Sequence, residues 1–217
     1  MAAISVAGDT SGSVTLQAPA VAGSSVLTLP VATDTLVGKA TTDTLTNKTL
    51  GPGLVAGASL LTSGTAQAST SGTSIDFTGI PSWVKRITVM FNGVSTNGAS
   101  SIQAQIGSGS FTTTGYAGTA STIVNATVAV VTAMASGFLV TADNAASVVY
   151  EGSFTICNIT GNTWVESGVL GRSVFSIASM NSSAGRLSLS STLDRVRITT
   201  VNGTDTFDAG SINIMYE

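Results

Sequence analysis

The chain has 217 residues, enough for one large all-β domain or for a smaller domain with an extension. Charged residues make up only 9% of the sequence and the formal net charge is −3, which argues against the dense basic surface that binds nucleic acid. The single cysteine, Cys157, excludes an intrachain disulfide and is expected in a strand as a small apolar residue. The first residues do not have the basic and apolar regions of a signal peptide, which predicts synthesis in a cytoplasm.

Residues 1–60 are predicted to form an extended arm with isolated strands. The runs VTLQAP (14–19) and VLTLP (26–30) alternate in hydrophobicity, and a proline stops each run because proline donates no ladder hydrogen bond. The segment 38–53 has five threonines and no periodic apolar face, so it can bury little surface by itself. We therefore expect such an arm to be ordered only by packing against other copies of the chain or a larger assembly.

Residues 61–217 are predicted to form an all-β domain. Apolar and polar residues alternate with period two along this region, and turn signals separate the runs. The pattern is typical of an antiparallel β-sandwich of jelly-roll type, which we expect to fold without the arm. Residues 193–217 are predicted to form its last two half-buried strands, joined by an Asn-Gly-Thr-Asp loop.

A first hairpin is predicted over residues 84–107. If Asn97-Gly98 forms a two-residue type I′ turn, Phe91 lies opposite Ala104 and Val89 lies opposite Ile106. This register places one set of apolar residues on a single face of the sheet: Ile87, Val89, Phe91, Ile102, Ala104 and Ile106.

The apolar stretch 123–140 has about the length of a bilayer span. Polar residues such as Asn125 and Thr132 interrupt it, and no Lys or Arg flanks it closely. We interpret it as part of a soluble β-rich region. A membrane-active segment is the alternative interpretation.

A second hairpin is predicted over residues 148–175, with a type II′ turn at Gly161-Asn162. The register places Phe154 opposite Val169 and Glu151 opposite Arg172. The two charged side chains would then form a modest cross-strand ion pair, and we prefer this structural role to a catalytic one.

The sequence offers little catalytic chemistry. It contains no histidine, the side chain that most often acts as a general base or metal ligand. One cysteine cannot form a zinc site, and we expect no metal and no cofactor. Carboxylate-only catalysis would have to use acids whose spacing singles out no pair, namely Glu151, Glu166, Asp194, Asp205 and Asp208. We therefore expect that the protein is not an enzyme.

Three segments resemble sequences that recur in virion appendage proteins of tailed bacteriophages, chiefly tail fibres and related adhesins. They are TLPVATDTLVGKATTDTLTNKTL (28–50), IDFTGIPSWVKRITVMFNGVST (75–96) and LDRVRITTVNGTDTFDAGSINIMYE (193–217). The resemblance implies a homotrimer in which residues 1–60 dock on other virion proteins while the β-sandwich, residues 61–217, faces outward. Packing among three copies would then order the threonine-rich arm.

Two virion functions fit this resemblance. A short trimeric tail fibre or adhesin would bind host-surface glycan through exposed loops, in which five residues are the candidates: Tyr116, Asn162, Trp164, Asn202 and Asp205. Aromatic loop tips favour this function because sugar faces stack on aromatic rings. The alternative is a capsid decoration protein, a cement or head fibre that stabilises the shell; a polysaccharide depolymerase is a minor alternative. In each case we expect a virion location after synthesis in the host bacterial cytoplasm, with no membrane insertion.

Overall fold

The computed structural model describes residues 3–7, 13–17, 61–124, 127–146, 148–173 and 179–217. The chain divides into two units, Met1–Leu54 and Val55–Glu217. In the first unit, β1 (Ala3–Ala7) pairs antiparallel with β2 (Ser13–Gln17), which covers most of the first strand predicted in the arm. The second predicted run, 26–30, and the threonine-rich segment 38–53 lie outside the described residues.

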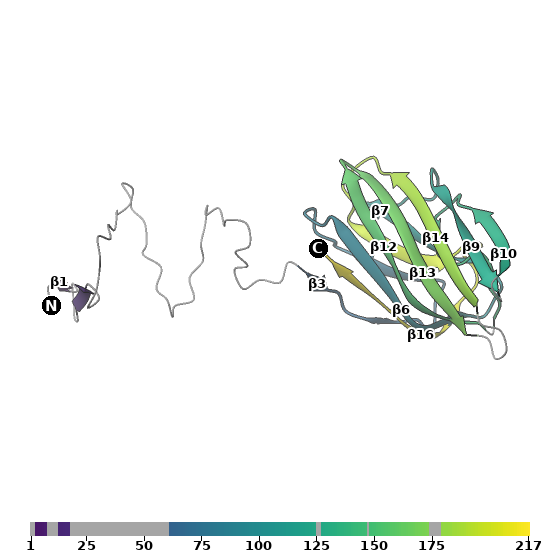
Figure 1. Cartoon of the computed structure of the whole chain (residues 1–217), viewed down its shortest axis with the longest axis horizontal. Helices are drawn as coiled ribbons and strands as arrows, with labels where there is room; N and C mark the ends of the chain where they lie inside the picture. Colours follow the sequence, from purple (N-terminus) through teal and green to yellow (C-terminus); the bar gives the residue numbers. More distant parts are fainter. Residues whose placement is uncertain (1–2, 8–12, 18–60, 125–126, 147, 174–178) are drawn as a thin grey trace. The chain divides into compact units, whose positions relative to one another are not determined.

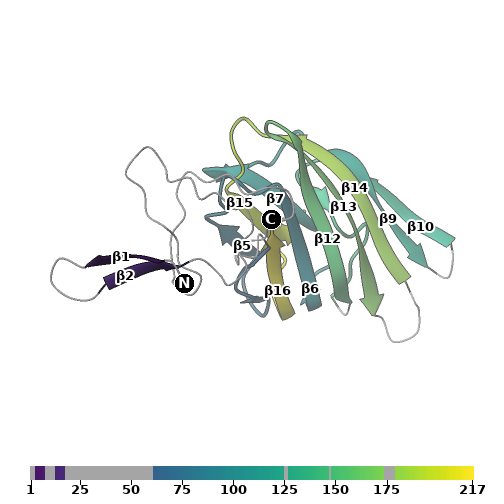
Figure 2. The ribbon, with the colours of Figure 1, turned by 60° about the vertical axis from the view of Figure 1, so that its left-hand side comes forward.

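In the second unit the described strands form two antiparallel sheets that lie face to face (Figures 1 and 2). The larger sheet has nine strands in the order β10-β9-β14-β13-β12-β6-β16-β3, and β4 also pairs with β16. Its strands are β3 (Thr62–Ser63), β4 (Gln67–Ala68), β6 (Arg86–Thr96), β9 (Ala117–Val124), β10 (Thr127–Ala133), β12 (Val149–Thr160), β13 (Thr163–Ser173), β14 (Ser179–Ser188) and β16 (Phe207–Tyr216).

The smaller sheet has five strands in the order β11-β7-β15-β5, and β8 also pairs with β7. Its strands are β5 (Ser74–Thr78), β7 (Ile102–Ser108), β8 (Ser110–Phe111), β11 (Phe138–Leu139) and β15 (Arg195–Thr200). Strand β5 lies at one end of this order, so in the described part of the chain only β15 pairs with it.

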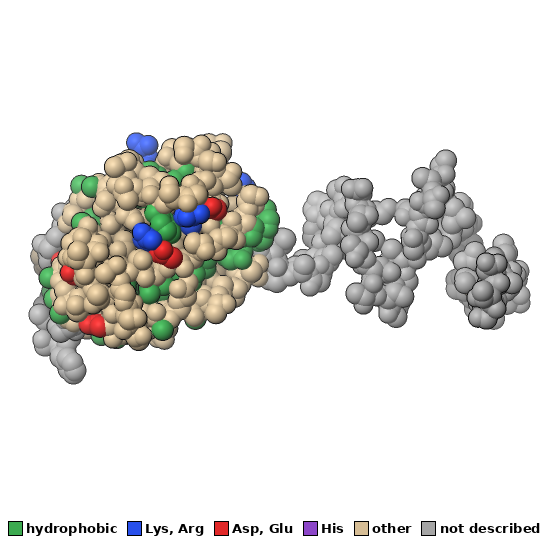
Figure 3. Space-filling model, turned by 180° about the vertical axis from the view of Figure 1, so that it is seen from behind, with side chains coloured by type: hydrophobic (Ala, Val, Ile, Leu, Met, Phe, Trp, Pro, Cys, Tyr) green, Lys and Arg blue, Asp and Glu red, His purple; other side chains and the backbone are tan. Residues whose placement is uncertain are grey.

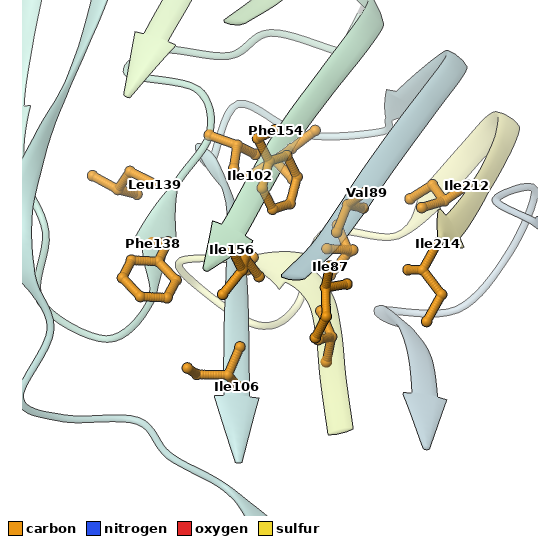
Figure 4. Close-up of a cluster of buried hydrophobic side chains, with 14 of the residues drawn as sticks. Ile87, Val89, Ile102, Ile106, Phe138, Leu139, Phe154, Ile156, Ile212 and Ile214 are labelled. Atoms are coloured by element: carbon orange, nitrogen blue, oxygen red, sulfur yellow. The ribbon is translucent and has the colours of Figure 1, made fainter. Parts of the chain in front are cut away.

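The hydrophobic core lies between the two sheets. Figure 4 shows Ile87 and Val89 of β6 together with Phe154 and Ile156 of β12, and all four side chains are buried. Ile102 and Ile106 reach the same core from β7 of the smaller sheet. Every regular element in the described residues is a strand, and no helix among them is long and apolar enough to cross a membrane. The prediction of an all-β antiparallel sandwich is confirmed.

The predicted hairpin over residues 84–107 is wrong, because β6 and β7 belong to different sheets. Both edges of β6 are occupied, by β12 and β16. Asn97 does not begin a tight turn; its main chain and side chain bind Thr206 in the loop between β15 and β16, with N···O distances of 2.9 and 2.8 Å. Gly98 has no left-handed φ, which a type I′ turn requires.

The pattern of buried residues in this region was nevertheless predicted correctly. The six apolar residues assigned to one face of the hairpin are all buried: Ile87, Val89, Phe91, Ile102, Ala104 and Ile106. They face one another across the core instead of lying side by side in one sheet. The alternation of apolar and polar residues predicts which face of a strand is buried. It does not show whether two strands pair in one sheet or face each other across the core, because the alternation is the same in both cases.

The second predicted hairpin is present as β12 and β13, but its register is wrong. Next to the turn Thr160 lies opposite Thr163, as predicted, and then an irregularity between Asn158 and Thr160 shifts the pairing by one residue. Phe154 therefore lies opposite Gly168, whose added Cβ would be 2.1 Å from the Phe154 Cβ, so only glycine fits there. This bulge could not be predicted from alternation.

The predicted Glu151–Arg172 pair is also wrong as a result of this shift. Tyr150 lies opposite Arg172 and Glu151 lies opposite Gly171, so the two charged side chains belong to opposite faces of the sheet. Arg172 instead donates to Asp143 Oδ2 at 2.8 Å. Glu151 Oε1 accepts a bond from Ser173 Oγ at 3.4 Å.

The apolar stretch 123–140 contributes to strands β9, β10 and β11, which agrees with its interpretation as a β-rich region. Cys157 lies in β12 with a free, half-buried thiol, also as predicted. The two predicted C-terminal strands are β15 and β16. Each of them lies in a different sheet, so the loop between them crosses from one sheet to the other.

Candidate binding groove

The outer face of the five-stranded sheet carries hydrogen-bonding side chains from neighbouring strands. In β15 the inward residues Val196 and Ile198 are buried, and the residues between them point outward. The register places Arg197 beside Gln105 of β7 on one side and Asp76 of β5 on the other. Thr199 lies between Gln103 and Ser74 in the same way.

Two ion pairs hold charged side chains on this face. Arg197 donates from Nε and from its terminal NH2 group to the two carboxylate oxygens of Asp76, each at 2.7 Å. This bond, more than the burial that opposes it, raises the pKa of Arg197 above its ordinary value. Arg195 makes a similar pair with Asp194, at 2.7 and 3.1 Å, and the Arg195 hydrogen bond lowers the pKa of Asp194.

Phe111 lies beside both arginines. The Arg197 guanidinium carbon is 4.0 Å from the Phe111 ring centroid, and that of Arg195 is 5.6 Å away. Figure 3 views the molecule from behind Figure 1, where two pairs of adjacent basic and acidic groups lie beside a hydrophobic patch. Because each guanidinium already has a carboxylate partner, these arginines are fixed in position rather than free to bind anions.

Two buried glutamines form the next part of this face. Gln105 donates from Nε2 to the Ser136 carbonyl at 2.9 Å, and Ser136 donates from Oγ to Gln103 Oε1 at 2.9 Å. Gln103 also donates to the Thr200 carbonyl at 3.4 Å. The segment around Ser136 is thereby tied across the outer face of β7.

A groove of about 340 Å³ lies on this face, and most of the residues that line it carry a hydroxyl, amide or guanidinium group. We call it the polar groove. Its lining residues are Thr73, Ser74, Gln103, Gln105, Thr113, Ser136, Arg197, Thr199, Thr200, Val201, Asn202 and Gly203. Such a lining can exchange hydrogen bonds with a ligand rich in hydroxyl groups.

Asn202, one of the predicted binding residues, lies at the end of the polar groove and is exposed. Its side chain organises the loop: Oδ1 accepts from the backbone of Thr204 at 3.0 Å and of Asp205 at 3.2 Å, and Nδ2 donates to Asp205 Oδ1 at 2.6 Å. Asp205 also accepts from the Ser100 backbone at 2.9 Å. The structure therefore brings Asn202 and Asp205 together, but of the two only Asn202 lines the groove.

The other three predicted binding residues lie elsewhere. Tyr116 and Trp164 are 5% and 4% exposed, so the expectation that they are aromatic loop tips is wrong. Tyr116 accepts from the Ile106 backbone at 2.8 Å, donates to the Thr112 carbonyl at 3.0 Å and packs edge-on against Phe138. Asn162 is half-buried in the β12–β13 turn, at the opposite end of the strands from Asn202.

The five candidate carboxylates do not come together. Glu166 is buried in the core, where Ser183 donates to its Oε1 at 2.7 Å and its Oε2 has no partner; burial, partly offset by Ser183, raises its pKa to about 7. Asp194 pairs with Arg195, and Asp205 with Asn202. Asp208 accepts from Ser95, and Glu151 from Ser173. Among the described residues no group of three or more His, Cys, Asp or Glu is arranged to hold a metal.

Comparison of the chain with protein-family models, with curated proteins and with solved structures finds no match. The fold and the groove define an antiparallel β-sandwich with a preorganised polar groove on one sheet.

Sequence reasoning missed most of the polar groove. Residues 193–217 were predicted to form two half-buried strands, and the alternation of Val196 and Ile198 with Arg197 and Thr199 could have identified the last two as outward-facing. Gln103 and Gln105 alternate with the apolar residues Ile102, Ala104 and Ile106 in the same way. Their proximity to Arg197 depends on which strands pair, and the incorrect 84–107 hairpin assigned β7 to the wrong neighbour.

Proposed function

We propose that the protein is a structural virion protein of a tailed bacteriophage. It would act as a short trimeric tail fibre or adhesin that docks through residues 1–60 and binds host-surface glycan with its β-sandwich. Three segments that resemble virion appendage proteins support the phage assignment, and the antiparallel sandwich is compatible with it. The proposal treats the protein as a binding protein and not as an enzyme.

The polar groove is the observation that carries the glycan-binding part of this proposal. Its lining offers hydrogen-bond donors and acceptors that lie close to one another. Apart from Val201 and Gly203, every lining residue has a polar side chain. Two charge-assisted bonds hold Arg197 to Asp76, so part of the binding surface needs little ordering when a ligand arrives. A neutral sugar fits this chemistry better than an anionic one, because the guanidinium charge is already balanced.

Blocking the groove tests this proposal. Thr113 is exposed and lines the groove, so Thr113→Trp should fill the groove without disturbing the core. On an array of bacterial surface polysaccharides we expect the full-length protein to bind at least one glycan, and the variant to bind it about tenfold more weakly or worse. Thr70→Trp is the matched control, since Thr70 is exposed and does not line this groove. Unchanged glycan binding by Thr113→Trp, or no glycan bound by the wild type, would overturn the glycan assignment.

Imaging of labelled virions tests the position on the particle. An adhesin should place the label on the tail, at a host-facing site. A label spread over capsomer junctions would favour capsid decoration, and a particle without label would remove the virion assignment.

A further inference from the structure

A second groove, of about 250 Å³, lies along β5 at the edge of the sandwich. One wall consists of consecutive residues 76–80 of the five-stranded sheet and its exit from β5. The other wall comes from the nine-stranded sheet and the segment before it, through Gly64, Thr65, Gln67, Ile214 and Tyr216. We call this the edge groove.

The floor of the edge groove is the edge of β5 that faces away from β15, and among the described residues no strand pairs with this edge. Gln67 donates from Nε2 to the Asp76 carbonyl at 2.7 Å, so this carbonyl points away from β15 and toward the groove. In an antiparallel strand the N–H and C=O of one residue point to the same side, and alternate residues share that side. The main-chain groups of Asp76 and Thr78 therefore both face the groove.

An aromatic pair adjoins one end of the groove. Tyr216 lines it, and the Trp83 ring lies next to Tyr216 with centroids 5.9 Å apart. Trp83 is 51% exposed because it sits in a turn, closed by a bond from Val84 N to the Pro81 carbonyl at 3.1 Å, that turns the side chain out of the core. A half-exposed tryptophan beside a groove is typical of a binding anchor.

The charge of the groove restricts its occupant. Asp76 is the only charged residue among those that line it, and its carboxylate is bound to Arg197. An occupant therefore gains nothing from a net charge. It gains most from main-chain hydrogen bonds at the two-residue spacing of a strand and from an apolar side chain at the aromatic end.

We propose that the edge groove binds an extended, uncharged peptide segment of a protein partner, which adds a strand to the free edge of β5. An apolar or proline side chain of this segment would pack against Trp83 and Tyr216. The incoming strand would replace the Gln67 amide, which now makes at the Asp76 carbonyl the bond that a strand neighbour would make. The main-chain donors and acceptors along β5 have the spacing of a strand, which favours a peptide over a sugar. A sugar would stack on Trp83 and would not need the β5 edge.

Peptide selection with two variants tests this proposal. A displayed library of random nine-residue peptides is selected on the full-length wild-type protein, and the enriched peptides are then measured against Trp83→Ala and Thr78→Pro. Proline is tolerated at an edge position whose N–H faces outward, so Thr78→Pro should fold while blocking strand addition. Ile159→Ala is the control, because Ile159 is another exposed hydrophobic residue and lies outside the groove.

We expect both variants to weaken peptide binding about tenfold or more, and Ile159→Ala to leave it unchanged. Bound peptide should also slow hydrogen exchange at the Thr78 amide of the wild type. Three results would overturn the proposal. The selection could enrich no peptide, or Thr78→Pro could bind the enriched peptides as tightly as the wild type does. The third result is a neutral oligosaccharide that binds the wild type and Thr78→Pro but not Trp83→Ala. Glycan binding in the polar groove should be unaffected by either variant.

Discussion

Glu166 and Asp76 are both carboxyl side chains on strands, but one faces the core from the nine-stranded sheet and the other lies on the outer face of the five-stranded sheet. Glu166 is 2% exposed and receives a single hydrogen bond, from Ser183. Asp76 receives two bonds from one guanidinium group, each at 2.7 Å. Burial therefore favours the protonated form of Glu166, whereas two hydrogen bonds from Arg197 fix the Asp76 carboxylate in position.

This contrast separates residues that shape the groove from residues that affect only the domain's stability. On the groove face each of the two arginines has a carboxylate partner, so the groove keeps its geometry without a ligand. In the core an unpartnered carboxyl oxygen makes the free energy of unfolding depend on pH. Changes to Glu166 should therefore alter stability, while changes to Asp76 or Phe111 should alter the groove.

The largest effect is expected for Glu166→Gln, in the pH dependence of stability. The pKa of folded Glu166, about 7, lies above the value of 4.5 for an unperturbed carboxyl, so protonation stabilises the fold. This contribution is complete below pH 4.5 and is lost as pH rises through 7. The wild type should lose about 3 kcal/mol of unfolding free energy across this window, whereas Glu166→Gln should not show that loss. Urea unfolding at several pH values measures the free energy of unfolding of the wild type and of Glu166→Gln.

Glu151→Gln is the matched control for that experiment. Glu151 is exposed on the neighbouring strand, so its replacement should leave the pH dependence of the wild type in place. A pH profile that is the same for the wild type and Glu166→Gln would show that the buried carboxyl does not control stability.

An intermediate effect is expected for Asp76→Asn. The substitution keeps the size of the side chain but removes the charge that fixes Arg197, and both partners are about one-third exposed, at 33% and 32%. Because solvent already screens the pair, we expect the free energy of unfolding to fall by only about 1 kcal/mol. Glycan binding in the polar groove should weaken, whereas peptide binding in the edge groove should persist because strand addition uses the main chain of β5 and not the Asp76 carboxylate.

Glu217→Gln is the control for Asp76→Asn. It removes the charge from the Arg86–Glu217 pair, whose side chains are 53% and 37% exposed, and should change stability by less than about 0.5 kcal/mol. The assignment of Asp76 to the polar groove would be contradicted by either of two results. In the first, Asp76→Asn and Glu217→Gln lower the free energy of unfolding equally. In the second, Asp76→Asn weakens glycan binding and peptide binding equally.

The sequence predicted the buried face of β6 and β7 and the pairing of β12 with β13, but not the partners of β6 and β7 or the register between β12 and β13. Alternation placed Ile87, Val89, Ile102 and Ile106 in a core, and they are there. The partner of β6 is set by contacts far apart in sequence, such as Asn97 with Thr206, which no local pattern reveals. The bulge near Ile159 similarly shifted a correctly located hairpin by one residue.

The candidate site was less predictable than the fold. Tyr116 and Trp164 were expected in exposed loops, but both side chains are buried in the core. Trp83 follows Pro81-Ser82 in a turn, and that local signal could have identified the exposed aromatic residue. The polar groove combines residues from three strands and four loops, so it becomes visible only once the strand order is known.

The smallest effect is expected for Phe111→Leu, which tests whether the ring itself helps to position Arg197. The guanidinium carbon lies 4.0 Å from the ring centroid, a distance at which the ring face attracts a cation. Leucine keeps apolar contact but has no such face, so we expect a loss of about 0.5–1 kcal/mol in unfolding free energy and a modestly weaker glycan affinity. Phe111→Tyr keeps the ring and should behave like the wild type. If leucine and tyrosine give the same stability and affinity, the ring contributes only packing, and the Asp76 carboxylate alone orients Arg197 in the groove.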